Sequence, residues 1–148
     1  MERVSLVIVA VLLSGWTTSN KEDHFGEGGT FSAVTLEQTG GPGLVVKCVE
    51  RRLAVRLVSG GGDMFKTGTS YVVKLRADKG PITTTAGKAI SERIIQLETQ
   101  ADMVRTIRKA SETALRVESA TDISSTFVYN TAGGVKAFAR IAQGCNLD

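Results

Sequence analysis

Apolar and polar residues alternate along three stretches in the middle of the chain. These stretches are residues 44–49, 53–58 and 71–78. In the first of them, Leu44, Val46 and Cys48 fall on one face. Period-two alternation between glycine-rich turns is typical of half-buried antiparallel strands. A fourth, less regular strand is predicted over residues 90–97.

A helical period replaces the alternation after residue 100. Met103, Val104, Ile107 and Ala110 fall on one stripe of a predicted helix. Two short strand candidates and a second helix follow it, at residues 114–119, 123–129 and 133–145. The predicted apolar stripe of the second helix consists of Val135, Phe138, Ala139 and Ala142.

The order of these elements is strand–strand–strand–strand–helix–strand–strand–helix. It predicts a single α+β domain over residues 44–148, in which an antiparallel sheet of about five to six strands carries two helices packed on one face. A chain of 148 residues is in keeping with one domain of this kind.

The first 19 residues resemble a secretory signal peptide. The apolar run Val4–Leu13 is too short for a membrane-spanning helix, which needs about 20 apolar residues. Residues 13–15, Leu-Ser-Gly, have the form of a lipoprotein processing site, but Trp16 stands where that site requires the lipidated cysteine. A weak ordinary cleavage site precedes Asn20, which predicts a periplasmic or secreted protein. The alternative is an uncleaved segment that tethers the protein to a membrane.

Residues 20–43 are interpreted as a flexible tether. They are polar and glycine-rich and show no sustained periodicity, a composition that does not fold by itself. Residues 30–36 are an exception that could form an edge strand. The single histidine, His24, lies in this segment and is interpreted as a solvated linker residue.

The two cysteines are the most informative residues for the compartment. Cys48 lies on the inward face of the first predicted core strand, and Cys145 lies at the border of the apolar stripe of the last helix. In an exported protein such a pair predicts a disulfide. Two buried free thiols are the alternative if the chain stays in the cytosol. A metal site is not expected, because two cysteines without histidine partners leave a zinc ion half-ligated. No cofactor is expected either.

Several motifs between residues 44 and 145 are similar to those of a family of exported proteins. They are L-V-V-K-C, V-K-L-R-A-D, A-L-R-V and F-V-Y-N-T-A-G-G-V-K-A-F-A-R-I-A-Q-G-C. With Arg76, Asp78 and the two cysteines, this segment resembles the VasI family of small proteins associated with type VI secretion, and related prophage-encoded envelope proteins. The resemblance implies a periplasmic accessory protein and carries over no catalytic residues.

Catalytic chemistry has few candidates in this sequence. The predicted domain contains no histidine, so a Ser-His-Asp or Cys-His arrangement cannot form there. The stretch G-G-G-D-M-F-K-T-G-T lacks the order of a phosphate-binding loop and is interpreted as a flexible hairpin loop. Paired carboxylates leave a cell-wall hydrolase as an alternative, and its candidates are Glu92, Glu98, Asp102, Glu118 and Asp122. We nevertheless expect a protein that is not an enzyme.

A binding surface is the preferred hypothesis. Lys47, Arg56, Lys74 and Arg76 fall on the outward side of predicted strands and would form a cationic face if those strands are neighbours. Such a face suits an acidic protein partner in the cell envelope. The net charge of +3 is well below that of a dedicated nucleic-acid binder, so no nucleic acid is expected. The alternative function is that of a phage- or prophage-encoded envelope protein that acts in exclusion or host interference. A solvated sheet face without a partner is the structural alternative.

Overall fold

The computed structural model describes residues 14–22, 28–121 and 124–148. In this part of the chain, one antiparallel sheet of nine strands is accompanied by three short helices. The strands are β1 (Thr17–Glu22), β2 (Gly29–Thr35), β3 (Gly43–Val49), β4 (Arg52–Val58), β5 (Ser70–Ala77), β6 (Ile82–Ser91), β7 (Ile94–Leu97), β8 (Glu112–Ser119) and β9 (Ser124–Asn130). The helices are α2 (Ala101–Lys109), α3 (Gly134–Ala137) and α4 (Ala139–Cys145).

The strands lie side by side in the order β1-β2-β3-β4-β7-β6-β5-β8-β9. Consecutive strands mostly pair as hairpins, but β4 and β5 are not neighbours, because the β6–β7 hairpin lies between them. Along each strand the side chains alternate between an inner, apolar face and an outer face. Leu44, Val46 and Cys48, for example, point inward and are at most 1% exposed.

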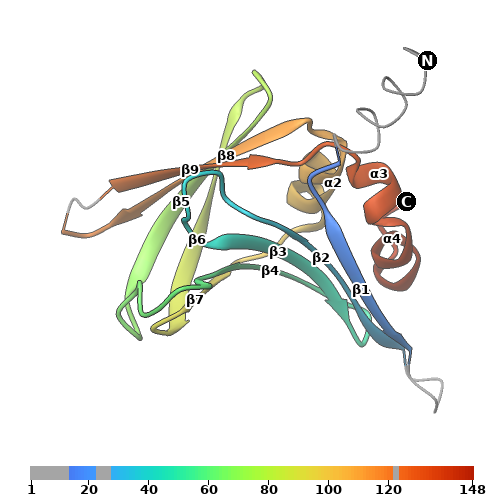
Figure 1. Ribbon diagram of the computed structural model, residues 1–148, viewed down its shortest axis with the longest axis horizontal. Coiled ribbons are helices and arrows are strands. Elements are labelled where there is room, and N and C mark those ends of the chain that lie inside the picture. Colours follow the sequence, from blue (N-terminus) through green and yellow to red (C-terminus); the bar gives the residue numbers. More distant parts are fainter. Residues whose placement is uncertain (1–13, 23–27, 122–123) are drawn as a thin grey trace, which may run out of the picture.

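The sheet is strongly curved, so that its two halves face each other across the core (Figure 1). Its far strand, β9, reaches the segment that follows β2 through a bridge between Glu37 and Tyr129. The Tyr129 hydroxyl donates a hydrogen bond to the Pro42 carbonyl at 2.7 Å, and Thr35 Oγ1 donates to the Asn130 carbonyl at 2.8 Å. These bonds hold the two halves together along one seam.

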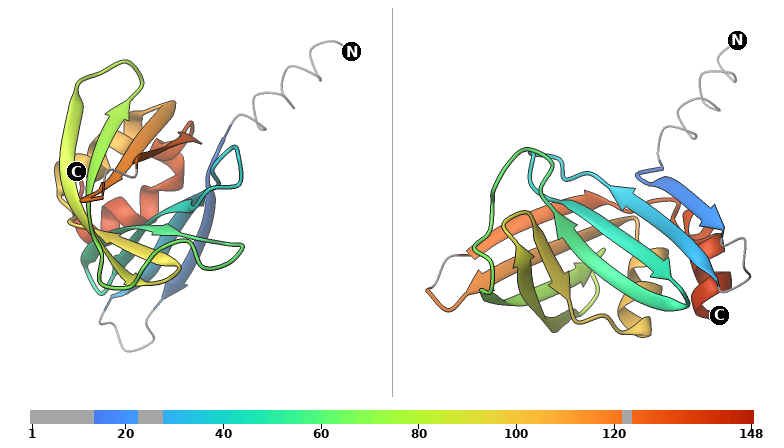
Figure 2. Two further views of the ribbon diagram at one scale, coloured as in Figure 1. Left: turned by 90° about the vertical axis from the view of Figure 1, so that its left-hand side faces the viewer. Right: turned by 90° about the horizontal axis from the view of Figure 1, so that it is seen from below.

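The three helices lie at one end of the curved sheet, and the end of β8 and the start of β9 lie at the other (Figure 1; Figure 2, right). We call the helix-covered end the closed end and the opposite end the open end. At the closed end Trp16 packs edge-on against Phe138, with ring centroids 4.8 Å apart. Its indole Nε1 donates to the Thr131 carbonyl at 2.9 Å, and the side chain is 9% exposed.

The expected α+β layout is therefore wrong. The sheet has nine strands instead of five to six, and the helices cap one end of it instead of lying as a pair on one face. The predicted strand over residues 90–97 is in fact the turn of the β6–β7 hairpin with parts of both strands. Most of β6 was not predicted, because the polar residues Thr83, Thr84 and Lys88 interrupt the apolar alternation.

The described parts of residues 20–43 do not form a flexible tether. Strands β1 and β2 pair from Thr17–Val34 to Glu22–Gly29, and β2 pairs in turn with β3. Strand β2 is an internal strand that buries Phe31 and Ala33. Trp16 belongs to the same folded unit, so a cut before Asn20 would remove a core side chain together with half of β1. Residues 1–13 and His24 lie outside the described residues.

The last helix also differs from its prediction. It is broken into α3 and α4 around Phe138. The buried apolar side chains are Phe138, Ile141 and Ala142, whereas Val135 is 59% exposed and Ala139 is also exposed. The break moves the apolar stripe, because each short helix sets its own rotation. Among the described residues, no helix has both the length and the hydropathy needed to cross a membrane.

Candidate functional site

The disulfide between Cys48 and Cys145 is confirmed. It joins the inner face of β3 to the last residue of α4, across a sequence separation of 97 residues and a Cα–Cα distance of 5.9 Å. It holds α4 against the sheet, where Gly144 packs tightly: a Cβ at this position would lie 3.2 Å from the Phe31 ring and 3.3 Å from Cys48 Sγ. The described residues hold no free cysteine and no cluster of three or more metal-ligating side chains.

The four predicted face residues all lie on the outer side of the sheet. Strand order separates them into two pairs, because β7 and β6 lie between β4 and β5. Lys47 and Arg56 are diagonal neighbours on β3 and β4, and Lys74 and Arg76 are two residues apart on β5. The four residues alone therefore do not make a continuous patch.

Three further basic residues connect and extend these pairs. Arg52, Lys88 and Arg116 point outward from β4, β6 and β8, as their register with the predicted residues shows. Lys88 and Arg116 were missed because neither strand was correctly placed in the sheet. Their signal was present in the sequence as single basic residues between apolar ones. We call the full set the cationic face: Lys47, Arg52, Arg56, Lys74, Arg76, Lys88 and Arg116.

Charge is unevenly divided between the cationic face and the rest of the chain. Strands β3 to β8 place seven basic residues on their outer side and two acidic ones, Glu112 and Glu118, for a net charge of +5. The whole chain carries +3, so the remaining residues carry a net charge of −2. The sheet thus has a positive outer surface on a molecule that is otherwise slightly acidic.

At the β5–β8 side of the cationic face lies a shallow hollow of about 160 Å³. Lys74, Arg76 and Arg116 line it together with Ile82, which is 61% exposed. Lys74 forms an ion pair with Glu118 at 3.3 Å, and Arg76 Nε donates to the Gly80 carbonyl at 3.0 Å. Two arginines beside an exposed apolar side chain are suited to contact with another protein, because interfaces are enriched in arginine.

The other pair is more enclosed. Partial burial lowers the pKa of Lys47, and the charge of Arg56 lowers it further. Arg56 Nε donates to Gln96 Oε1 at 2.6 Å, which holds the guanidinium against the surface of the sheet. An acidic partner would relieve the repulsion between the two cations.

The Arg-x-Asp motif at Arg76 and Asp78 has a clear structural role. Asp78 Oδ1 accepts hydrogen bonds from the backbone N–H groups of Ser111 and Glu112, at 3.1 and 3.0 Å. Arg76 meanwhile binds carbonyls of the β5–β6 turn. The two side chains together fix the β5–β6 turn against the start of β8. They thereby stabilise the hollow that β5 and β8 line.

The described carboxylates that were considered for a hydrolase do not gather at a single site. Glu118 is paired with Lys74, and Asp102 forms an ion pair with Arg105 at 2.8 Å. Glu98 lies with Asp102 around a cavity of about 130 Å³. Asp122 lies outside the described residues. The ion pairs of Glu118 with Lys74 and of Asp102 with Arg105 are contacts that surface carboxylates commonly make.

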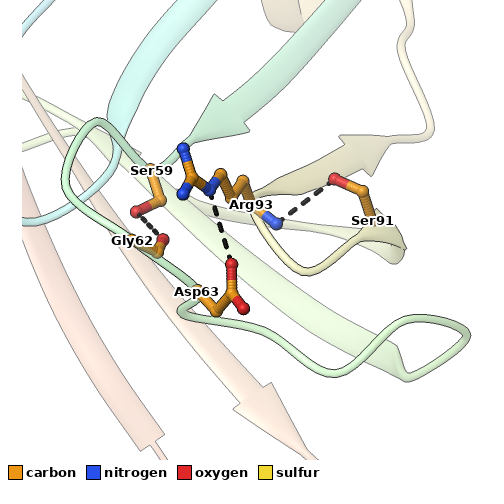
Figure 3. Close-up of polar contacts among 5 residues, drawn as sticks. All are labelled: Ser59, Gly62, Asp63, Ser91 and Arg93. Carbon is orange, nitrogen blue, oxygen red and sulfur yellow. Dashed lines mark hydrogen bonds and ion pairs between the residues drawn. The ribbon is translucent and has the colours of Figure 1, made fainter.

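Glu92 lies in the β6–β7 turn and contacts the 59–69 segment, which was expected to be a flexible hairpin loop. The segment 59–69 is not a hairpin loop, because it crosses the end of the β6–β7 hairpin on its way from β4 to β5. The Glu92 carbonyl accepts hydrogen bonds from the N–H groups of Met64 and Phe65, both at 2.8 Å. Figure 3 shows two further fastenings: Ser59 Oγ bonded to the Gly62 carbonyl at 2.6 Å, and Arg93 paired with Asp63 at 3.4 Å.

The pKa values of two carboxylates are shifted in opposite directions: Glu92, near the open end, and Glu37, at the seam. A hydrogen bond with Asp63, and the charge of that group, raise the pKa of Glu92. For Glu37, which is 8% exposed, burial raises the pKa, but hydrogen bonds from Thr39 and Gly41 outweigh it and leave the pKa below its ordinary value. Glu37 is thereby kept ionised at the seam of the sheet.

Comparison with protein-family models, with curated proteins and with solved structures finds no match to this chain.

Proposed function

We propose that this protein is an exported, non-enzymatic binding protein of the bacterial envelope that holds an acidic protein partner through its cationic face. The observation that supports the proposal most is the division of charge, +5 on the outer side of β3–β8 against −2 elsewhere. An acidic surface would be steered to this face, and its approach in any other orientation would be disfavoured.

The disulfide supports export. Such bonds form and persist in oxidising compartments, and the pair here links β3 to the last residues of the chain. The periplasm is the compartment that the signal-like N-terminal segment favours. Association with a type VI secretion system is the finer form of the proposal, and it rests on the sequence resemblance of residues 44–145.

A matched pair of charge variants tests the face. Lys88→Glu/Arg116→Glu changes two exposed positions of the cationic face, and Lys109→Glu/Lys136→Glu changes two exposed helix positions away from it. Each double variant lowers the net charge by four, from +3 to −1. Any difference between them therefore reflects where the charge lies.

Binding to poly-L-glutamate, to vesicles of anionic phospholipid and to duplex DNA is measured for both variants at low and physiological salt. The proposal predicts that the face variant loses at least tenfold in affinity for the acidic polypeptide, that the helix variant loses little, and that salt weakens the interaction. Equal losses in both variants would contradict it. Preferential binding to vesicles or DNA would assign the face to a different class of partner.

A further inference from the structure

The open end of the sheet contains a hollow of about 520 Å³ on the inner face, opposite to the cationic face. Tyr71, Val117 and Phe127 of β5, β8 and β9 form its floor, and Met64 and Phe65 of the 59–69 segment cover it. The volume lies within the range of about 300–1,000 Å³ that small-molecule sites occupy. We call this cavity the open-end hollow.

The lining of the open-end hollow is largely apolar and partly exposed to solvent. Met64 is 44% exposed, and Phe65, Tyr71 and Phe127 pack against the core without being fully buried. Replacing water by an apolar ligand at such a concave surface is favourable, because it removes apolar surface from water. The corresponding space at the closed end is filled by Trp16 and Phe138, whereas at the open end no side chain of residues 14–22, 28–121 or 124–148 fills it.

The hollow is already formed without a ligand. The 59–69 segment is fixed by the two bonds to the Glu92 carbonyl and by the Arg93–Asp63 pair (Figure 3), so Met64 and Phe65 are held over the floor. Phe65 and Tyr71 meet edge to face with ring centroids 6.2 Å apart. On the other side Gly41 packs so closely against Phe127 that a Cβ would lie 2.8 Å from the ring. Because these residues are already held in place, little free energy of binding is spent on ordering them when a ligand binds.

The chemistry of the lining selects one class of ligand. Lys66 is the only charged residue among the described residues that line the hollow, and it is exposed and takes part in no ion pair within the described part of the chain. The other polar groups are hydroxyls, of which those of Ser119 and Thr121 bond to each other at 2.9 Å. An apolar chamber with one ammonium and hydroxyls beside it suits an alkyl chain that ends in a carboxylate.

We propose that the open-end hollow binds a single-chain fatty acid, with the alkyl chain between Phe65 and Phe127 and the carboxylate at Lys66. This activity is independent of the proposed partner face, since the two sites lie on opposite sides of the sheet. A sugar ligand is disfavoured because the described lining residues offer no amide or carboxylate side chain to bind its hydroxyls.

The test uses the full chain and sodium dodecanoate below its critical micelle concentration, followed by isothermal titration calorimetry. Ser125→Trp places an indole in the hollow, and Ser124→Trp places the same group on the outer face of the same strand, since Ser125 pairs with Val117 and Ser124 with Glu118. The expected result is binding to the wild type and to Ser124→Trp, and at least a tenfold loss in Ser125→Trp. No binding to the wild type, or equal affinities of the two variants, would overturn the proposal.

The carboxylate contact is tested with Lys66→Gln, measured against dodecanoate and against dodecan-1-ol. The proposal predicts a five- to tenfold loss for the acid and no change for the alcohol. An equal effect on both ligands would overturn it. Lys88→Glu/Arg116→Glu should leave dodecanoate binding unchanged, which keeps a failure of the partner face distinguishable from a failure of the hollow.

Discussion

The two ends of the sheet use similar aromatic residues for different purposes. At the closed end, the ring centroids of Trp16 and Phe138 are 4.8 Å apart. Phe138 is fully buried at the junction of α3 and α4, and the disulfide ties α4 to β3. At the open end, Phe65 and Tyr71 meet at 6.2 Å beside an unfilled hollow. Buried aromatic side chains stabilise the fold at the closed end. The other end can then remain available to a ligand.

The largest effect should come from the disulfide at the closed end. Cys48→Ala/Cys145→Ala removes a cross-link over a separation of 97 residues, and chain-entropy reasoning gives a loss of about 4–5 kcal/mol in the free energy of unfolding for a loop of this size. Urea unfolding followed by circular dichroism measures it. Wild-type protein in reductant should approach the variant, and a loss below about 1 kcal/mol would show that the closed end does not depend on this bond.

Truncating one phenylalanine at each end compares the two regions directly. Phe138→Ala should cost about 3–5 kcal/mol, because the ring is fully buried and leaves a cavity. Phe65→Ala should cost about 1 kcal/mol, because its ring borders the hollow and is only partly buried. The same unfolding assay is used for both. Equal losses would remove the distinction between the ends.

Trp16→Phe tests the closed end more finely. The aromatic contact with Phe138 is retained, but the indole N–H that binds the Thr131 carbonyl is lost. The expected cost is about 1–2 kcal/mol, since a buried carbonyl loses its partner. Ser19→Ala, on the exposed strand β1, is the control and should change little. If Trp16→Phe were as stable as the wild type, the hydrogen bond would not contribute to fixing the N-terminal segment.

The smallest effects should appear in the pH dependence of two carboxylates. Because the folded-state pKa of Glu92 is raised, its contribution is present in acid and is lost as the pH rises through that pKa. Backbone amides of Met64 and Phe65 should therefore exchange faster towards neutral pH, after correction for intrinsic rates. Glu92→Gln should remove this dependence, and an unchanged profile in the variant would contradict the assignment.

Glu37 should behave in the opposite way. Its folded-state pKa is lowered, so its contribution is present above the unfolded pKa and is lost as the pH falls through the folded one. Glu37→Gln should flatten the acid limb of a plot of stability against pH, and leave the limb near neutrality unchanged. A variant as acid-sensitive as the wild type would mean that other carboxylates cause the loss.

The sequence allowed a correct prediction where strands are internal and alternate clearly. Residues 44–49 show this best, since the predicted inner residues Leu44, Val46 and Cys48 are buried and the predicted disulfide forms. The 101–112 period likewise corresponds to α2, with Val104 and Ile107 buried. Each of these segments packs one face against the core, so its apolar residues recur with the period of the strand or helix.

The rest depended on contacts that no local pattern reveals. Strand β1 is T-T-S-N-K-E, with all six residues exposed, so it gives no alternation and is held by pairing to β2 and by Trp16. The order of β4, β7, β6 and β5 follows from a segment that crosses a hairpin, and this order determines which basic residues share the cationic face. The open-end hollow is made by three separate segments, which only the folded sheet brings together.

Hydrogen–deuterium exchange of the full chain, with and without dodecanoate, tests the difference between the two ends most directly. Binding at the open end predicts new protection in residues 59–69 and in β8–β9, with no change in residues 14–22 or 134–147. Protection at the closed end, or no ligand-dependent protection anywhere, would contradict the division between an end that stabilises the fold and an end that binds a ligand.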